Sequence, residues 1–145
     1  MGRLVWWLRI VGVLYVVNAG MMAIVRAPIR SSAPGGTLDA ASAGEPLAEF
    51  VVDTWLGFGL EVAIIGVLLL VASVVPALAV GVAWTAIGIE ITRGMIWDLY
   101  MLSQGYDAAV FVPWLFIHAA IIGTGVYVLR GQQSRGGTTA APAAV

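Results

Sequence analysis

Apolar residues gather along this chain in four long runs, separated by segments of polar and turn-forming residues. The runs cover about residues 4–25, 50–71, 77–102 and 109–129. Each run reaches the roughly 20 residues that a helix needs to cross the hydrocarbon core of a bilayer. The pattern therefore predicts an all-α fold, a four-helix transmembrane bundle, as one domain over residues 1–130.

The connections between these runs differ in length. Residues 26–49 are expected to form one long outer loop rich in Ala, Ser, Gly and Pro, in which Pro28, Pro34, Gly35-Gly36 and Pro46 break any long helix. The links near residues 73–76 and 103–107 are short, so neighbouring helices should be antiparallel. Residues 131–145 contain few large apolar side chains, and we expect a disordered C-terminal tail there.

The first run also has some features of a signal peptide. Arg3 supplies a positive flank, and Val17-Asn18-Ala19 resembles a small-residue cleavage site. The apolar run continues to Val25, however, well beyond the ~7–15 residues of a signal-peptide core. A spanning helix is the favoured interpretation.

Composition supports a lipid bilayer as the surrounding partner. Of the 145 residues, 61% are hydrophobic and 10% are charged, whereas a soluble domain carries about 25% charged residues. The net charge of −1 provides no basic face for nucleic acid, so nucleic-acid binding is not expected. The absence of cysteine excludes disulfides and thiolate metal sites.

Arginine positions predict the orientation of the bundle, because positively charged residues favour the cytoplasmic ends of spanning helices. Four spans place both termini on one side of the membrane. That side carries Arg3, Arg9, Arg130 and Arg135, against Arg26 and Arg30 on the other. Both termini of this multi-pass protein are therefore expected to be cytoplasmic.

Several ionisable residues lie inside the predicted spans, where each charge costs about 2.5–3.5 kcal/mol on insertion scales. Glu90 and Arg93 are three residues apart, so we expect them to share a helix face and form an ion pair. At 1.5 Å of rise per residue, the four helices contribute polar groups to one layer near the midplane. This layer is the candidate binding site, and its residues are Asn18, Glu61, Glu90, Arg93 and His118.

Two interpretations of this layer remain open. Buried charges can fix the register of helices as a salt-bridge network, or they can bind a ligand or a proton. His118 taken alone is more typical of a hydrogen bond between helices. Nearer the membrane surface we expect a hydrated rim formed by Asp53, Asp98, Tyr100, Asp107 and Arg26.

Metal, cofactor and catalytic sites are not predicted. Carboxylate-bridged metal bundles use Glu-x-x-His pairs, which this chain lacks, and Arg93 would repel a cation. The serines lie in loops or turns and His118 is the only histidine, so no nucleophile and base come together as a pair. We therefore expect a protein without enzymatic activity.

Four segments together resemble the BphX-like family of small bacterial membrane proteins. They are Arg3 through Tyr15, Met21 through Arg30, Gly59-Leu-Glu-Val62 and Trp84 through Tyr100. The resemblance extends to about Arg130 and implies a four-helix protein of the bacterial cell membrane. The family is named for its occurrence beside biphenyl-degradation genes, and the resemblance assigns no role to individual residues.

The expected function follows from the polar layer. We expect the protein to bind, or to help transport, a small molecule or a proton there, with a small hydrophobic or aromatic solute as one candidate ligand. Four helices are few for a complete transporter, so transport would require a homo-oligomer. The alternative is a structural or accessory subunit that pairs with a partner membrane protein.

Overall fold

The structure is a computed structural model that describes residues 2–22 and 46–136. Its regular elements in these ranges are all helical, which confirms the predicted all-α class. They are α1 (Gly2–Gly20), α4 (Pro46–Ala72), α5 (Pro76–Ile89), the π-helix η2 (Glu90–Ile96), α6 (Trp97–Ser103) and α7 (Ala108–Gly136). Because α5, η2 and α6 follow one another without a break, they form one long helix, and the described chain contains four helical rods.

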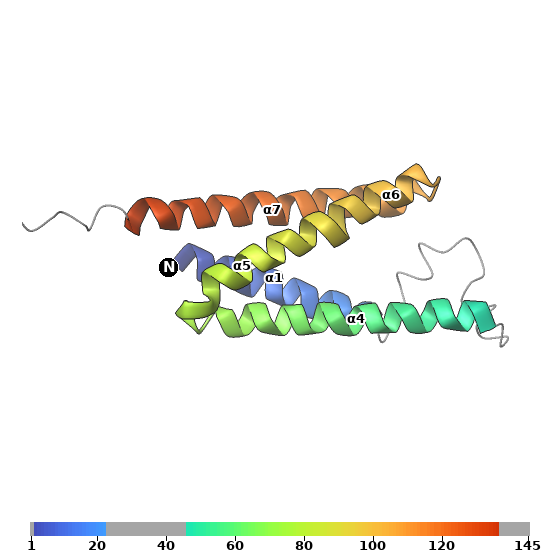
Figure 1. Cartoon of the computed structure of the whole chain (residues 1–145), viewed down its shortest axis with the longest axis horizontal. Helices are drawn as coiled ribbons and strands as arrows, with labels where there is room; N and C mark the ends of the chain where they lie inside the picture. The colour runs from blue at the N-terminus through green and yellow to red at the C-terminus, as the bar shows by residue number, and fades with distance from the viewer. Residues whose placement is uncertain (1, 23–45, 137–145) are drawn as a thin grey trace, which may run out of the picture.

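The rods are arranged as a bundle that is closed at one end and open at the other. Figure 1 shows α4 and α7 running along opposite edges, with α5, η2 and α6 crossing obliquely from the end of α4 to the start of α7. The ends of the described chain, near Gly2 and Gly136, lie at the same end of the bundle as the turn at residues 73–75. Towards the opposite end, α4 and α6 diverge.

The hydrophobic core fills the closed end. Helix α1 buries Leu4, Leu8, Val11 and Tyr15, which recur every three or four residues and therefore share one face. Opposite them α5 presents Ala79, Ala83 and Ala86, whose small side chains let helices approach closely. At the same end, the indole N–H of Trp7 donates a hydrogen bond to Thr124 Oγ1 of α7, at 3.0 Å.

Helices α1 and α4 touch backbone to backbone at a pair of glycines. A Cβ built on Gly66 would lie 2.9 Å from the carbonyl oxygen of Gly12, and a Cβ on Gly12 would lie 3.0 Å from that of Gly66. Since real Cβ atoms do not approach a backbone oxygen so closely, both positions require glycine for this crossing. The α1–α4 pair is also the most extensive helix contact of the described chain.

Two helices extend beyond their predicted bounds. Helix α4 already begins at Pro46, and α7 continues to Gly136. The first part of the predicted tail is therefore helical, because residues such as Arg130 and Gln132 propagate a helix well without being apolar. Residues 23–25 of the predicted first helix, 26–45 of the predicted loop and 137–145 of the predicted tail lie outside the described residues.

Three helical stretches are long and apolar enough to cross a membrane: Gly2–Gly20, Pro76–Ser103 and Ala108–Gln132. The apolar part of α4, Leu56–Ala72, is shorter. Large apolar side chains also cover the outside of the bundle, among them Ile10, Leu60, Ile64 and Phe116. This outer surface resembles a core more than a water-facing shell.

The glycine crossing generates a stability prediction. The Gly66→Ala variant should lower the free energy of unfolding by about 1–3 kcal/mol, because the new methyl group overlaps the backbone of Gly12 and forces α1 and α4 apart. Thermal unfolding in mild detergent, followed by circular dichroism, would measure the change.

Gly57→Ala is the matched control on the same helix. A Cβ at Gly57 meets nothing within 4 Å, and alanine favours helix over glycine by about 0.8–1.0 kcal/mol. This variant should unfold at the wild-type temperature or above it. Equal unfolding temperatures for the two variants would contradict the tight crossing.

Candidate functional site

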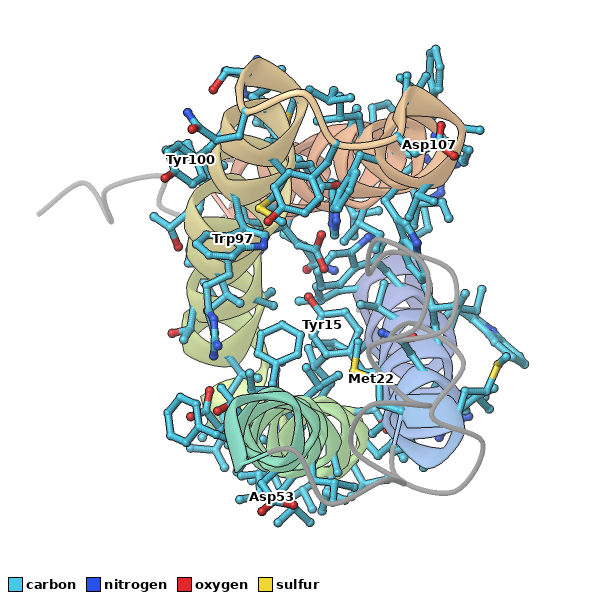
Figure 2. The ribbon with its side chains drawn as sticks, turned by 90° about the vertical axis from the view of Figure 1, so that its right-hand side faces the viewer. Tyr15, Met22, Asp53, Trp97, Tyr100 and Asp107 are labelled. Atoms are coloured by element: carbon cyan, nitrogen blue, oxygen red, sulfur yellow. The ribbon has the colours of Figure 1, made fainter. Side chains whose placement is uncertain are left out.

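A pocket of about 370 Å³ lies where the helices diverge, toward the open end of the bundle. Its walls come from α1, α4, α5, η2, α6 and α7. Figure 2 shows Tyr15 of α1, and Met22 just beyond that helix, pointing into the space between the helices. Most of the lining is apolar, and it includes Leu14, Val17, Met21, Met22, Phe58, Val62, Ile65, Ile89, Trp97, Val110, Phe111, Trp114, Ile117 and Ile121.

Helix α7 contributes one continuous face to this pocket. Phe111, Trp114, His118 and Ile121 are spaced by three or four residues, so a helix places them in a single row. The rings of Trp114 and His118 are stacked, with centroids 6.1 Å apart and planes 30° apart. The imidazole of His118 therefore lies at the pocket wall, and the Trp114 ring stacks on one face of it.

His118 lies between two acidic side chains of the facing helix. Its Nδ1 atom is hydrogen-bonded to Glu90 Oε2, and its Nε2 atom lies 3.4 Å from Asp98 Oδ2. The Tyr15 hydroxyl donates to the other carboxylate oxygen of Glu90, Oε1. Three helical rods thus meet in one polar cluster, which consists of Tyr15, Glu90, Asp98 and His118.

Gly94 makes room for the imidazole. A Cβ built on Gly94 would lie 2.5 Å from His118 Nδ1 and 2.6 Å from its Cγ. Gly94 is four residues after Glu90 and four before Asp98. The imidazole ring therefore lies over Gly94, between the two carboxylates of the same continuous helix. The helix needs glycine here because any side chain would occupy the place of the ring.

Asp98 is buried, and its predicted place in a hydrated rim was wrong. Only 6% of its surface is exposed, although it lies near the end of a predicted span. The divergence of α4 from α6 leaves a pocket there, and Asp98 faces that pocket and His118 instead of the bundle exterior. Its Oδ2 atom is buried and makes no hydrogen bond, since its 3.4 Å contact with His118 Nε2 lacks hydrogen-bond geometry.

Arg93 pairs with Glu61 of α4, so the predicted Glu90–Arg93 ion pair was also wrong. A π-helix closes its hydrogen bonds between residues five apart, and each turn therefore holds more residues than an α-helical turn. Within η2, a residue three positions on no longer returns to the same face. Glu90 consequently faces α1 and α7, whereas Arg93 reaches α4 and lies over the Phe58 ring, with Cζ 4.3 Å from the ring centroid.

The structure brings the predicted polar residues into one neighbourhood. Asn18, Glu90, Arg93 and His118 all line the pocket, and Glu61 reaches its edge through Arg93. Of the predicted rim, Asp53, Tyr100 and Asp107 are exposed on the outside of the bundle, as Figure 2 shows, and Arg26 lies outside the described residues.

Sequence reasoning missed Tyr15 and misplaced Asp98. A signal for Tyr15 was available, because it precedes Asn18 by three residues and therefore shares its helix face. A similar signal for Asp98 was its spacing of four from Gly94 and eight from Glu90. Within residues 2–22 and 46–136, no group of three or more His, Asp and Glu side chains is arranged to hold a metal ion.

Comparison with known proteins identifies the family. A family model described as BphX-like matches residues 1–134. The chain belongs to the BphX-like family. The match extends over every residue of the polar cluster in this BphX-like chain, and it confirms the resemblance noted in the sequence. Comparisons with curated proteins and with solved structures found no match.

The fit of His118 over Gly94 can be tested by NMR, because this BphX-like chain contains one histidine. In Gly94→Ala, the methyl group should displace the imidazole and break its hydrogen bond to Glu90. The ring ¹⁵N signals of histidine-labelled protein should therefore shift from their wild-type positions.

Gly88→Ala is the control on the same continuous helix, because a Cβ at Gly88 meets nothing within 4 Å. Its histidine spectrum should match that of the wild type. A Gly94→Ala spectrum that is also unchanged would show that the imidazole does not lie against Gly94.

Proposed function

We propose that this chain is an integral membrane protein that binds a small, largely apolar molecule in the pocket between its helices. The observation that carries the proposal is the pocket itself. Ligand sites are typically cavities of about 300–1,000 Å³, lined by apolar and aromatic side chains with a few convergent polar groups. The 370 Å³ pocket, with Tyr15, Glu90, Asp98 and His118 in its wall, fits this description.

Placement in a membrane is supported by the outer surface of the bundle. Three stretches have the length and hydropathy of spanning helices, and large apolar side chains point outward from all four rods. Arg3 and Arg9 bond to Tyr127 and Ser73 at the closed end, and Arg130 directly follows Leu129 of the core, so the arginine bias favours a cytoplasmic location for that end and for both termini. The pocket would then lie in the outer half of the bilayer.

The divergence of α4 from α6 suggests a route into the pocket. Figure 1 shows the two helices separating toward the open end, and the Arg93–Glu61 ion pair joins α4 to η2 in this region. An apolar molecule dissolved in the bilayer could approach the pocket between these helices without passing through water. Binding is the proposed activity, and transport of the same molecule would need a second opening or a second copy of the chain.

Filling the pocket should abolish binding. Ile117→Trp adds an indole to the lining, whereas Phe116→Trp, on the neighbouring residue, places one on the outer surface. A ligand that binds the folded state raises its thermal stability. In a thermal-shift assay, small neutral hydrocarbons and alcohols should therefore raise the unfolding temperature of the wild type and of Phe116→Trp. They should not change the unfolding temperature of Ile117→Trp. Equal stabilisation of both variants would refute binding in this pocket.

A second candidate function, an accessory subunit, is favoured by the Arg93–Glu61 ion pair. Their side chains are 45% and 59% exposed, although both lie well inside the predicted spans. Ionisable residues within membranes normally face protein or a water-filled cavity and not lipid. A second protein surface packed against this part of α4 and η2 would shield the ion pair from lipid.

Single-cysteine variants can test this covering surface, because the chain has no cysteine. Leu60, next to Glu61, is 64% exposed, and Ile10 on α1 is similarly exposed at 65%. If a second copy covers α4, Leu60→Cys should form a disulfide-linked dimer on oxidation in membranes, and Ile10→Cys should not. Monomeric Leu60→Cys, together with a monomeric mass in mild detergent, would count against self-assembly through this face.

A further inference from the structure

The polar cluster in the pocket carries an imbalance of charge. Glu90 and Asp98 are both buried, and a single imidazole lies between them. Even with His118 doubly protonated, two carboxylates and one imidazolium leave one negative charge in apolar surroundings. Buried charge of this kind is unfavourable unless a proton or a cation compensates it.

Among the described residues that line the pocket, no other basic side chain supplies the missing charge. Arg93 is the one arginine in the pocket lining, and its guanidinium is paired with Glu61. Arg3 and Arg9 belong to the closed end, where they bond to Tyr127 and Ser73. The positive charge of Arg93 is thus already balanced, which removes the repulsion that the sequence alone suggested.

We propose that the pocket binds an organic ammonium ion, a small amine with an apolar body, whose N–H group bonds to the carboxylate of Asp98. The proposal rests on the binding function above and specifies the class of ligand. It requires a group that both donates a hydrogen bond and carries a positive charge.

The state of the two carboxylates locates the ammonium group. Both oxygens of Glu90 have partners, one in Tyr15 and one in His118. Asp98 Oδ2, by contrast, is buried and accepts no hydrogen bond, and Asp98 itself lines the pocket. Buried polar atoms are almost always hydrogen-bonded, so an exception on a residue that lines a cavity points to a missing donor.

The remaining walls suit the rest of such a ligand. Aromatic rings from all four rods line the pocket, including Tyr15, Phe58, Trp97 and Trp114. Aromatic faces attract cations, and the effect is stronger where water is excluded. Phe58 already makes this kind of contact with Arg93. An anionic ligand would instead meet the excess negative charge, and a hydrated metal ion would meet a mostly apolar wall.

Three compounds of similar shape separate charge from size: 2-phenylethylammonium, 2-phenylethanol and 3-phenylpropionate. Isothermal titration of the full chain in mild detergent should show the ammonium ion binding about ten-fold or more tightly than the alcohol, because hydrogen bonds to charged groups are the stronger ones. The carboxylate should bind most weakly. Ammonium binding should also shift the ¹⁵N signals of His118, which borders Asp98.

Asp98→Asn should remove the preference for the ammonium ion over the alcohol. Asp53→Asn, which removes an exposed carboxylate on α4, is the control and should keep that preference. The comparison of ligands on the wild-type protein does not depend on either variant folding.

Each result decides a specific point. Equal or tighter binding of the alcohol or the carboxylate to the wild type would overturn the ammonium proposal, as would ammonium binding that leaves the His118 signals unmoved. If neutral compounds bind and Ile117→Trp abolishes their binding, the proposed function stands and only the ligand class fails. If none of the compounds binds, both proposals fail.

Discussion

The contact of His118 with Glu90 and Asp98 is the interaction on which the open end of the bundle depends. It ties α7 to η2 and α6, and the Tyr15 hydroxyl extends the tie to α1. The core at the closed end is apolar and needs no such specificity, since small and large side chains fill it directly. Where the helices diverge, packing no longer fixes their positions. Hydrogen bonds and ion pairs between a few polar side chains take over that task.

Much of the fold could be predicted because hydropathy reports directly on helix length. Runs of about 20 apolar residues gave the number and order of the helices, and short links gave their directions. The ends were less predictable, since hydrogen bonding continues along α7 after the apolar pattern stops at Leu129. Hydropathy describes the surroundings of a helix, and it carries little information about where the backbone ceases to be helical.

The sequence predicted which polar residues lie near one another in the site, but it did not predict which of them form pairs. Depth along each helix placed Glu90, Arg93 and His118 near one another, because axial position depends only on residue number. Pairing depends on rotation around the axis, which an α-helical spacing predicts correctly only while the helix stays α-helical. The π-helix η2 covers residues 90–96, and it redirected Arg93 to Glu61. Asp98 was misplaced for a different reason: its burial follows from the arrangement of several helices and not from its distance to a span end.

The crossing of Gly12 and Gly66 gives the bundle a mechanical property. With no side chain between them, the α1 and α4 backbones are in direct contact there, while the ends of the same helices border the pocket. A given change in the angle at this crossing displaces the helix ends more than it displaces the residues near the crossing, because displacement grows with distance from it. The positions of Asn18 and Phe58, which line the pocket from α1 and α4, therefore depend on the angle at which these two backbones cross.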